Sequence, residues 1–221
     1  MVKLTRVWIN PLRTGARDLL RNPQAMKAAV YAGLPTQPVT ERPLWRLDRD
    51  NPHRPALLVL TRETPSFEHL VEQAGWPAAD QPQVDSRDYQ PVLDQLTAGA
   101  AFRFRLTANP TYADRKGVEP GQRGQRRAHV TIEHQTNWLL ERAGRWGITI
   151  PDDTATGVPA VAITARGTER FRRNGSRVTL TTATYEGLLT VHDPDTFRDQ
   201  LRAGFGPAKS YGCGLLTVAT R

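Results

Sequence analysis

Cysteine is almost absent from this sequence of 221 residues, which contains only Cys213. A single cysteine excludes an internal disulfide and any cysteine-rich zinc site. We interpret Cys213 as a small core residue at the start of the last strand rather than as a nucleophile. The five histidines match no zinc-ligand spacing with suitable partners, and we interpret them as structural or solvent-facing. The sequence therefore predicts no metal site and no cofactor.

Long hydrophobic runs are also missing. No stretch of about 20 apolar residues occurs, so no membrane-spanning helix is expected. The first residues lack the apolar core and small-residue cleavage site of a signal peptide. We therefore expect a cytoplasmic protein that does not bind a membrane.

Lysine is scarce, although the chain is basic. Of 30 basic residues only four are lysines, and 22 acidic residues leave a net charge of +8. The arginine excess is explained either by GC-rich coding or by function, since the planar guanidinium suits forked contacts with phosphate and guanine. The positive charge by itself favours a polyanionic partner, either nucleic acid or an anionic membrane.

Four closely spaced glycines surround Lys209 near the end of the chain: Gly204, Gly206, Gly212 and Gly214. Glycine allows positive φ, and the free N–H groups of such a loop suit phosphate oxygens. The spacing matches neither G-x-G-x-x-G nor the Walker A motif. We predict a phosphate-rich ligand bound through Gly204, Gly206 and Lys209, with an exposed loop cation as the alternative interpretation of Lys209.

Hydrophobic periodicity predicts the same order of elements, β-α-β-β-α-β, in each half of the chain. In the first half we expect a strand at 2–9, two short helices with Asn22 as the N-cap of the second, strands at 44–47 and 56–60, a helix through Phe67, Leu70 and Val71, and an edge segment and linker at 76–94. In the second half we expect a strand at 102–106, a polar loop at 109–127, a helix at 133–145, strands at 158–164 and 177–191, the latter broken near Glu186 and Gly187, a helix through Phe197 and Leu201, and a strand at 215–219. The expected fold is α+β, with domains at 1–94 and 95–221.

Two arginine-rich segments of the second half are candidates for RNA binding. The first is a glycine-containing loop with Arg115, Lys116, Arg123, Arg126 and Arg127. The second surrounds a hairpin turn predicted at Asn174 and Gly175. It contains Arg166, Arg170, Arg172, Arg173 and Arg177. Such cations could follow a phosphate backbone. A solvated charged surface without a ligand is the alternative for the first segment.

Three motifs resemble the CRISPR repeat-RNA processing endoribonucleases of type I-E systems, the CasE family. They are the opening strand, R-F-R-L-T-A-N-P at 103–110 and G-F-G-P-A-K-S-Y-G-C-G-L-L at 204–216. The resemblance implies two tandem ferredoxin-like (RRM-like) domains, a CRISPR repeat RNA hairpin as substrate and other Cascade subunits as partners. In the family both basic segments have counterparts near the RNA.

The resemblance also implies a reaction. In the family the 2′-hydroxyl attacks the adjacent phosphate without a metal, the 5′ oxygen leaves, and a 2′,3′-cyclic phosphate remains on a product that stays bound. This step requires a base, an acid and positive charge near the phosphorane.

One departure from the family pattern concerns catalysis. The family histidine in N-P-x-x-[ML]-H is replaced here by Lys27, and Gln24 stands where some relatives have tyrosine. An unperturbed lysine is neutral in only about one part in a thousand at pH 7, but it can stabilise negative charge. We place Lys27 and Tyr31 at the catalytic position, with a core role as the alternative for Tyr31. The hypotheses are thus an endoribonuclease with reduced activity, a binding-only RNA subunit and, more remotely, a basic scaffold without RNA.

Overall fold

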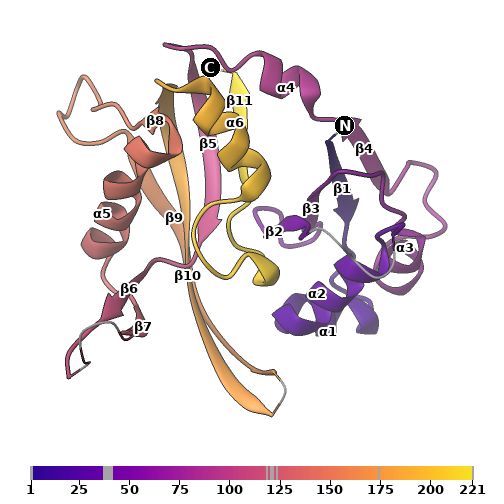
Figure 1. The fold of residues 1–221 in the computed structure, drawn as a ribbon. Coiled ribbons are helices and arrows are strands. Elements are labelled where there is room, and N and C mark those ends of the chain that lie inside the picture. The colour runs from indigo at the N-terminus through magenta and orange to yellow at the C-terminus, as the bar shows by residue number, and fades with distance from the viewer. Residues whose placement is uncertain are drawn as a thin grey trace. The chain divides into compact units, whose positions relative to one another are not determined.

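The chain forms two compact units, which are shown together in Figure 1. The computed structural model describes residues 2–220, apart from 37–41, 118, 120–121, 123 and 174. Unit 1 comprises Met1–Gln95, Arg170–Val178 and Ala208–Leu215, and unit 2 comprises Leu96–Glu169, Thr179–Pro207 and Leu216–Arg221. Two short segments from the second half of the chain therefore belong to unit 1. The domain division at residues 94 and 95 stays a prediction.

Unit 1 contains a four-stranded antiparallel sheet in the order β2-β3-β1-β4. Its elements are β1 (Lys3–Trp8), α1 (Thr14–Arg21), α2 (Pro23–Ala32), β2 (Leu44–Asp48), β3 (Ala56–Thr61), α3 (Glu68–Ala74) and β4 (Val84–Asp88), followed by α4 (Gln90–Asp94). With α1 and α2 forming a split first helix, this is a ferredoxin-like arrangement.

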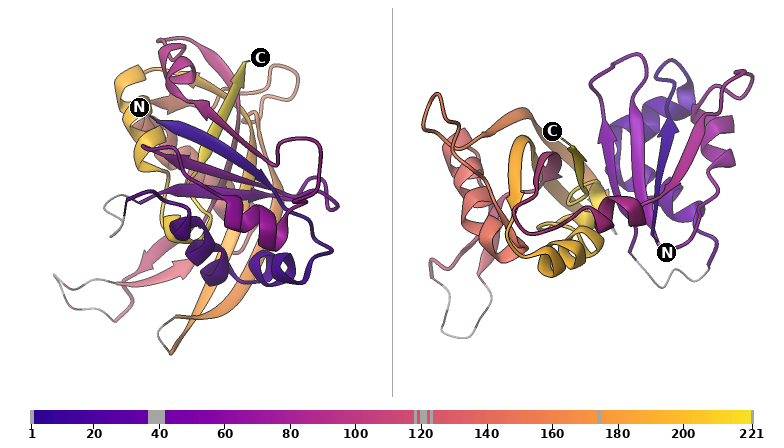
Figure 2. Two further views of the ribbon diagram at one scale, coloured as in Figure 1. Left: turned by 90° about the vertical axis from the view of Figure 1, so that its right-hand side faces the viewer. Right: turned by 90° about the horizontal axis from the view of Figure 1, so that it is seen from above.

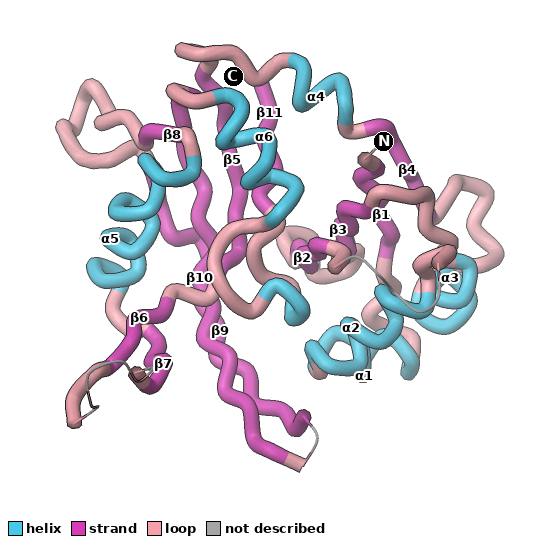
Figure 3. Tube along the Cα trace, in the orientation of Figure 1, coloured by secondary structure: helices cyan, strands magenta, loops and turns pink. Residues whose placement is uncertain are grey.

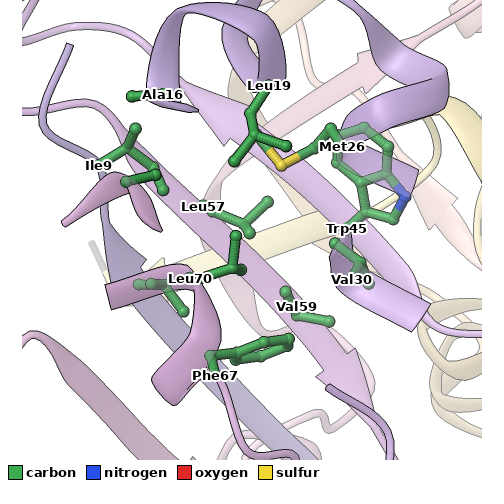
Figure 4. Close-up of a cluster of buried hydrophobic side chains, with 12 residues drawn as sticks. Ile9, Ala16, Leu19, Met26, Val30, Trp45, Leu57, Val59, Phe67 and Leu70 are labelled. Carbon is green, nitrogen blue, oxygen red and sulfur yellow. The ribbon is translucent and has the colours of Figure 1, made fainter. Parts of the chain in front are cut away.

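The core of unit 1 lies between this sheet and its three larger helices, which cover one face of it (Figure 2). Alternate strand residues such as Leu57 and Val59 point toward Leu19 of α1, Val30 of α2 and Leu70 of α3, as Figure 4 shows. All of these side chains are buried. Helix α2, which carries the predicted catalytic position, is therefore fixed by apolar packing.

Unit 2 repeats the topology with the sheet order β11-β5-β10-β8, and β9 also pairs with β10. Its elements are β5 (Ala101–Ala108), β6 (Thr111–Asp114), β7 (Gln125–Ala128), α5 (Ile132–Ala143), η1 (Gly144–Trp146), β8 (Ile148–Thr149), β9 (Val161–Arg173), β10 (Ser176–Val191), α6 (Pro194–Ala203) and β11 (Leu216–Thr220). Every second residue of β5 is buried. The rings of Trp138 in α5 and Tyr185 in β10 are stacked, with their centroids 6.3 Å apart. The outer ends of β9 and β10, visible as a long ribbon in Figure 3, are the residues that belong to unit 1.

The prediction of tandem ferredoxin-like domains is confirmed. The Asn22 cap is also confirmed, because its side chain accepts a hydrogen bond from the Gln24 N–H at 3.0 Å and Pro23 opens α2. Within the described residues, no helix is long and apolar enough to cross a bilayer.

Several element predictions were wrong in detail. The expected polar loop at 109–127 contains strand β6 and most of strand β7, which pair in antiparallel orientation. The edge segment expected within 76–94 is confirmed, because β4 lies at the edge of the sheet, although the helix α4 that follows it was not expected. Strand β10 is unbroken, since Gly187 lies within its ladder. A Cβ at Gly187 would lie 2.2 Å from the Ala160 carbonyl oxygen, which explains this glycine by close packing rather than by a break. Cys213 is a buried core residue, as expected, but it precedes the last strand instead of opening it.

Candidate nucleic-acid interface

Helix α2 positions Lys27 and Tyr31 in unit 1. Met26 and Val30 of this helix are buried in the core, which leaves Lys27 partly exposed beside them. The Lys27 Nζ lies 5.3 Å from the centre of the Tyr31 ring, within the range of a cation–π contact. Tyr31 also packs against the apolar core. Both interpretations of Tyr31 therefore fit its position, one turn along the helix from Lys27.

The second part of the glycine-rich segment, residues 208–215, belongs to the same unit. It contains the short helix η2 (Lys209–Tyr211), which contacts both α2 and β2. Ala208 has φ = 61°, and it is the one non-glycine residue with positive φ among those the structure describes. Strain of this kind, typically about 1–3 kcal/mol, persists only where the surroundings fix the backbone. The loop is therefore held in a defined conformation next to α2.

Lys209 is partly buried in this loop rather than fully exposed, and its contact with a phosphate stays a prediction. Burial lowers the pKa of Lys209 below its ordinary value, and the positive charge of Arg42 lowers this pKa further. Both causes disfavour the ammonium form, and a phosphate close to Lys209 would favour it. Lys209 is thus a side chain whose charged state an anion would stabilise.

The tip of the β9–β10 ribbon supplies a row of arginines to unit 1. Arg170, Arg172, Arg173 and Arg177 are exposed, whereas Phe171 between them is buried. The Phe171 ring packs against Tyr211 of η2, with ring centroids 4.9 Å apart. This contact ties the arginine-bearing tip to the loop that carries Lys209. Gly175 has φ = 79°, as expected for a tight turn, and Asn174 lies outside the described residues.

The other predicted cations lie in unit 2. Arg115, Lys116 and Arg126 are exposed on or beside the β6–β7 hairpin, and Arg123 lies outside the described residues. Arg127 Nε donates to Asp114 Oδ2 at 2.7 Å, which neutralises part of its charge. Arg166 is exposed on β9, and its guanidinium donates to the Val130 carbonyl.

Gly204 and Gly206 also lie in unit 2, and the backbone of each has positive φ. Gly204 is buried at the end of α6 with φ = 80°. Gly206 has φ = 72°, and a Cβ there would lie 2.9 Å from the Trp138 indole. Positive φ is thus the structural reason for both glycines, and close packing against Trp138 is a second reason for Gly206. Contact between either glycine and RNA stays a prediction.

Two residues of β2 that contact the glycine-rich loop, Trp45 and Arg46, were not predicted from the sequence. A Cβ on Gly212 would lie 2.7 Å from Cζ3 of Trp45, so the loop backbone lies directly against this buried indole. Arg46 Nη1 donates to the Leu215 carbonyl at 3.0 Å. The sequence signal was an arginine, Arg46, within an otherwise apolar strand. Such a signal does not show which distant residue the arginine contacts.

The histidines do not form a metal site in the described residues, where no group of three or more potential ligands comes together. The His69 ring nitrogen Nε2 lies 3.0 Å from the Ala29 carbonyl oxygen, consistent with a structural role. His129 lies beside Tyr112 and His134. Burial, followed by the charge of His134, lowers the pKa of His129.

Comparisons with known proteins agree with one another. Residues 3–220 match a family model described as CRISPR associated protein. The CRISPR-associated endoribonuclease Cse3 of Thermus thermophilus is 30% identical over 224 residues, covering 98% of this chain and 99% of the relative. The CRISPR system Cascade subunit CasE of Escherichia coli is 31% identical over 185 residues, covering 80% and 88%. A solved structure of T. thermophilus Cse3, bound to an RNA representing a pre-cleavage complex, is similar with a TM-score of 0.81, 30% identity and coverage of 99% and 98%.

Proposed function

The chain belongs to the CRISPR associated protein family and resembles its type I-E CasE members, and on this premise we propose that it is an endoribonuclease acting on CRISPR repeat RNA. It binds the repeat stem-loop, cleaves the precursor at the 3′ base of the stem and remains bound to the product. Cleavage follows attack of the 2′-hydroxyl on the adjacent phosphate. A P–O2′ bond forms, the P–O5′ bond breaks, and a 2′,3′-cyclic phosphate remains.

The observation that carries this proposal is the grouping of cations in unit 1. Lys27 on α2, Lys209 on η2 and the arginines of the β9–β10 tip come from three separate segments of one compact unit. Direct contacts of η2 with α2 and of Tyr211 with Phe171 connect these segments. Positive charge fixed in this way would stabilise the phosphorane without reorganising during the reaction.

The proposed roles divide between the two units. In unit 1, Lys27 and Tyr31 face the scissile phosphate, and the bound RNA backbone contacts Lys209 and the tip arginines Arg170, Arg172 and Arg173. In unit 2, the phosphates of the RNA stem contact the cations of the β6–β7 hairpin and Arg166. The RNA backbone also approaches Gly204 and Gly206. The hairpin cations are Arg115, Lys116, Arg123, Arg126 and Arg127. Recognition of stem shape and phosphates is expected, because base edges of double-stranded RNA lie in a deep, narrow groove.

A binding-only RNA subunit is the second candidate, and Lys27 is the observation that favours it. A lysine ammonium has three donors and no acceptor, so in its charged form it cannot take the proton of the 2′-hydroxyl. CasE of E. coli is named a Cascade subunit. We propose that this chain likewise holds the 3′ hairpin of the guide RNA within such a complex, whether or not it cuts.

A binding and cleavage assay with a repeat stem-loop in EDTA separates these functions. Retarded migration followed by a product with a 2′,3′-cyclic phosphate is expected for the endoribonuclease. Binding without any product, even after long incubation, would select the binding-only subunit. A repeat RNA whose nucleotide at the cut carries a 2′-deoxy sugar is the matched control, since it should bind equally and remain intact. Absence of binding would overturn both candidates.

Salt dependence tests the contribution of the β6–β7 hairpin to RNA binding. Each phosphate contact that is lost should reduce the slope of log affinity against log salt by about one unit. We expect the combined change of Arg123, Arg126 and Arg127 to alanine to flatten this slope. Arg126→Ala alone should have a larger effect than Arg127→Ala, because Asp114 already pairs with Arg127.

The control for this series is Arg202→Ala, which removes an arginine on α6 that is paired with Asp199. Its slope should equal that of the unchanged protein. If the triple variant also kept the full slope, the hairpin would lie outside the RNA-binding surface.

A further inference from the structure

Arg46 is a charged side chain buried in the middle of β2. Its side chain is 2% exposed, so its charge requires compensation by nearby groups. The Asp48 carboxylate compensates the charge by accepting two hydrogen bonds from the guanidinium. Arg46 Nε donates to Asp48 Oδ1 at 2.7 Å, and Arg46 Nη2 donates to Asp48 Oδ2 at 2.9 Å. Residues two apart on a strand share a face, which places the two side chains together. The pair is therefore a rigid, oriented group.

A third N–H donor of Arg46 reaches the glycine-rich loop. Arg46 Nη1 donates to the Leu215 carbonyl at 3.0 Å, and all three residues belong to unit 1. Leu215 is the last residue of the loop segment 208–215 before β11 begins. Trp45, the neighbour of Arg46, fills the space beside Gly212 in the middle of the same segment (its indole is shown in Figure 4). Strand β2 thus fixes the loop at two points.

We infer that Arg46 and Asp48 are a positioning pair, which holds the glycine-rich loop in the conformation that presents Lys209 to an RNA phosphate. This inference rests on the proposed function for the identity of the ligand. Arginine is required because one planar group must bind a carboxylate with two N–H donors and still reach the loop with a third. The single ammonium of lysine cannot satisfy this geometry.

The first test uses the free protein and needs no RNA. The chain contains only four lysines, Lys3, Lys27, Lys116 and Lys209, so ¹³C-methylation of the amines gives a simple NMR spectrum. The Lys209 signal is identified by its loss in Lys209→Arg. In Asp48→Asn and Arg46→Lys we expect the pKa of Lys209 to rise toward its ordinary value, because release of the loop reduces its burial. The other three lysines of the unchanged chain should titrate as before, and the lysine introduced by Arg46→Lys adds one further signal.

Arg49→Lys is the matched control, because Arg49 directly follows β2 and is exposed. Its guanidinium donates to the Leu20 carbonyl and not to the glycine-rich loop. It should leave the Lys209 titration unchanged. Asp48→Asn keeps the test decisive even where Arg46→Lys fails to fold, since it leaves the arginine in place. An unaltered Lys209 titration in folded Asp48→Asn would overturn the positioning role.

The second test measures affinity for the repeat stem-loop. Lys209→Met and Asp48→Asn should each weaken binding by about tenfold, and the double variant should be no weaker than Lys209→Met alone. Additive losses would show that the pair does not act through Lys209. Failure of the unchanged protein to bind the stem-loop would overturn the proposed function, while the lysine titration would still decide whether the pair holds the loop.

Discussion

Lys27→His is expected to raise the single-turnover rate of repeat-RNA cleavage by about 10²–10⁴-fold, the usual contribution of positioned acid–base catalysis. Imidazole titrates near neutral pH and can both accept and donate a proton, whereas a lysine ammonium can only donate. Helix α2 already holds this position with its cap and its buried Met26 and Val30. Rapid-quench measurement with excess protein gives the rate directly.

Binding should barely change in the same variant, because the remaining cations of the interface are retained. Lys27→Arg serves as the matched control, since it keeps the charge but offers no proton acceptor, and it should gain no rate. Lys27→Ala should lower any residual rate, because it removes the positive charge that we propose to lie near the phosphorane. If the unchanged protein cut rapidly and Lys27→His gave no gain, another residue would be the working base.

The sequence predicted the fold well because local signals agree with it throughout. The alternating pattern of β5 and the Asn22 cap before Pro23 each depend on a few consecutive residues of the sequence. Both are present in the structure. The β6–β7 hairpin was missed for a physical reason. Most residues of its two strands, such as Tyr112 and Arg126, are exposed. The sequence therefore shows no alternation of apolar and polar residues that would predict a strand there.

The arrangement of the candidate site could be predicted only in part. Lys27 and Lys209 follow from motifs, but the contacts that fix the loop join residues far apart along the chain. Gly212 faces Trp45, and Leu215 accepts from Arg46. Tertiary packing alone brings these pairs together, and a glycine in a sequence does not reveal which side chain occupies the space of its missing Cβ.

The packing of Gly212 leads to the second large expected effect, a loss of stability in Gly212→Ala. Its φ of 81° is strained for any L side chain, and the new Cβ would lie 2.7 Å from a Trp45 ring that the core holds in place. Backbone strain of about 1–3 kcal/mol and overpacking of about 1–3 kcal/mol together remove a large share of a typical unfolding free energy of about 5–15 kcal/mol. Thermal unfolding followed by circular dichroism should show a clearly lower midpoint.

Gly144→Ala is the matched control for this change, because the same methyl group is added where no heavy atom lies within 4 Å and φ is −57°. Alanine is favourable in such helical backbone, so the midpoint should stay the same or rise slightly. In Gly212→Ala the molecules that remain folded must move the loop away from Trp45, which displaces Lys209 and should weaken stem-loop binding. Equal midpoints and equal affinities for the two variants would mean that the loop does not lie against Trp45, and that its glycine serves only as a connector.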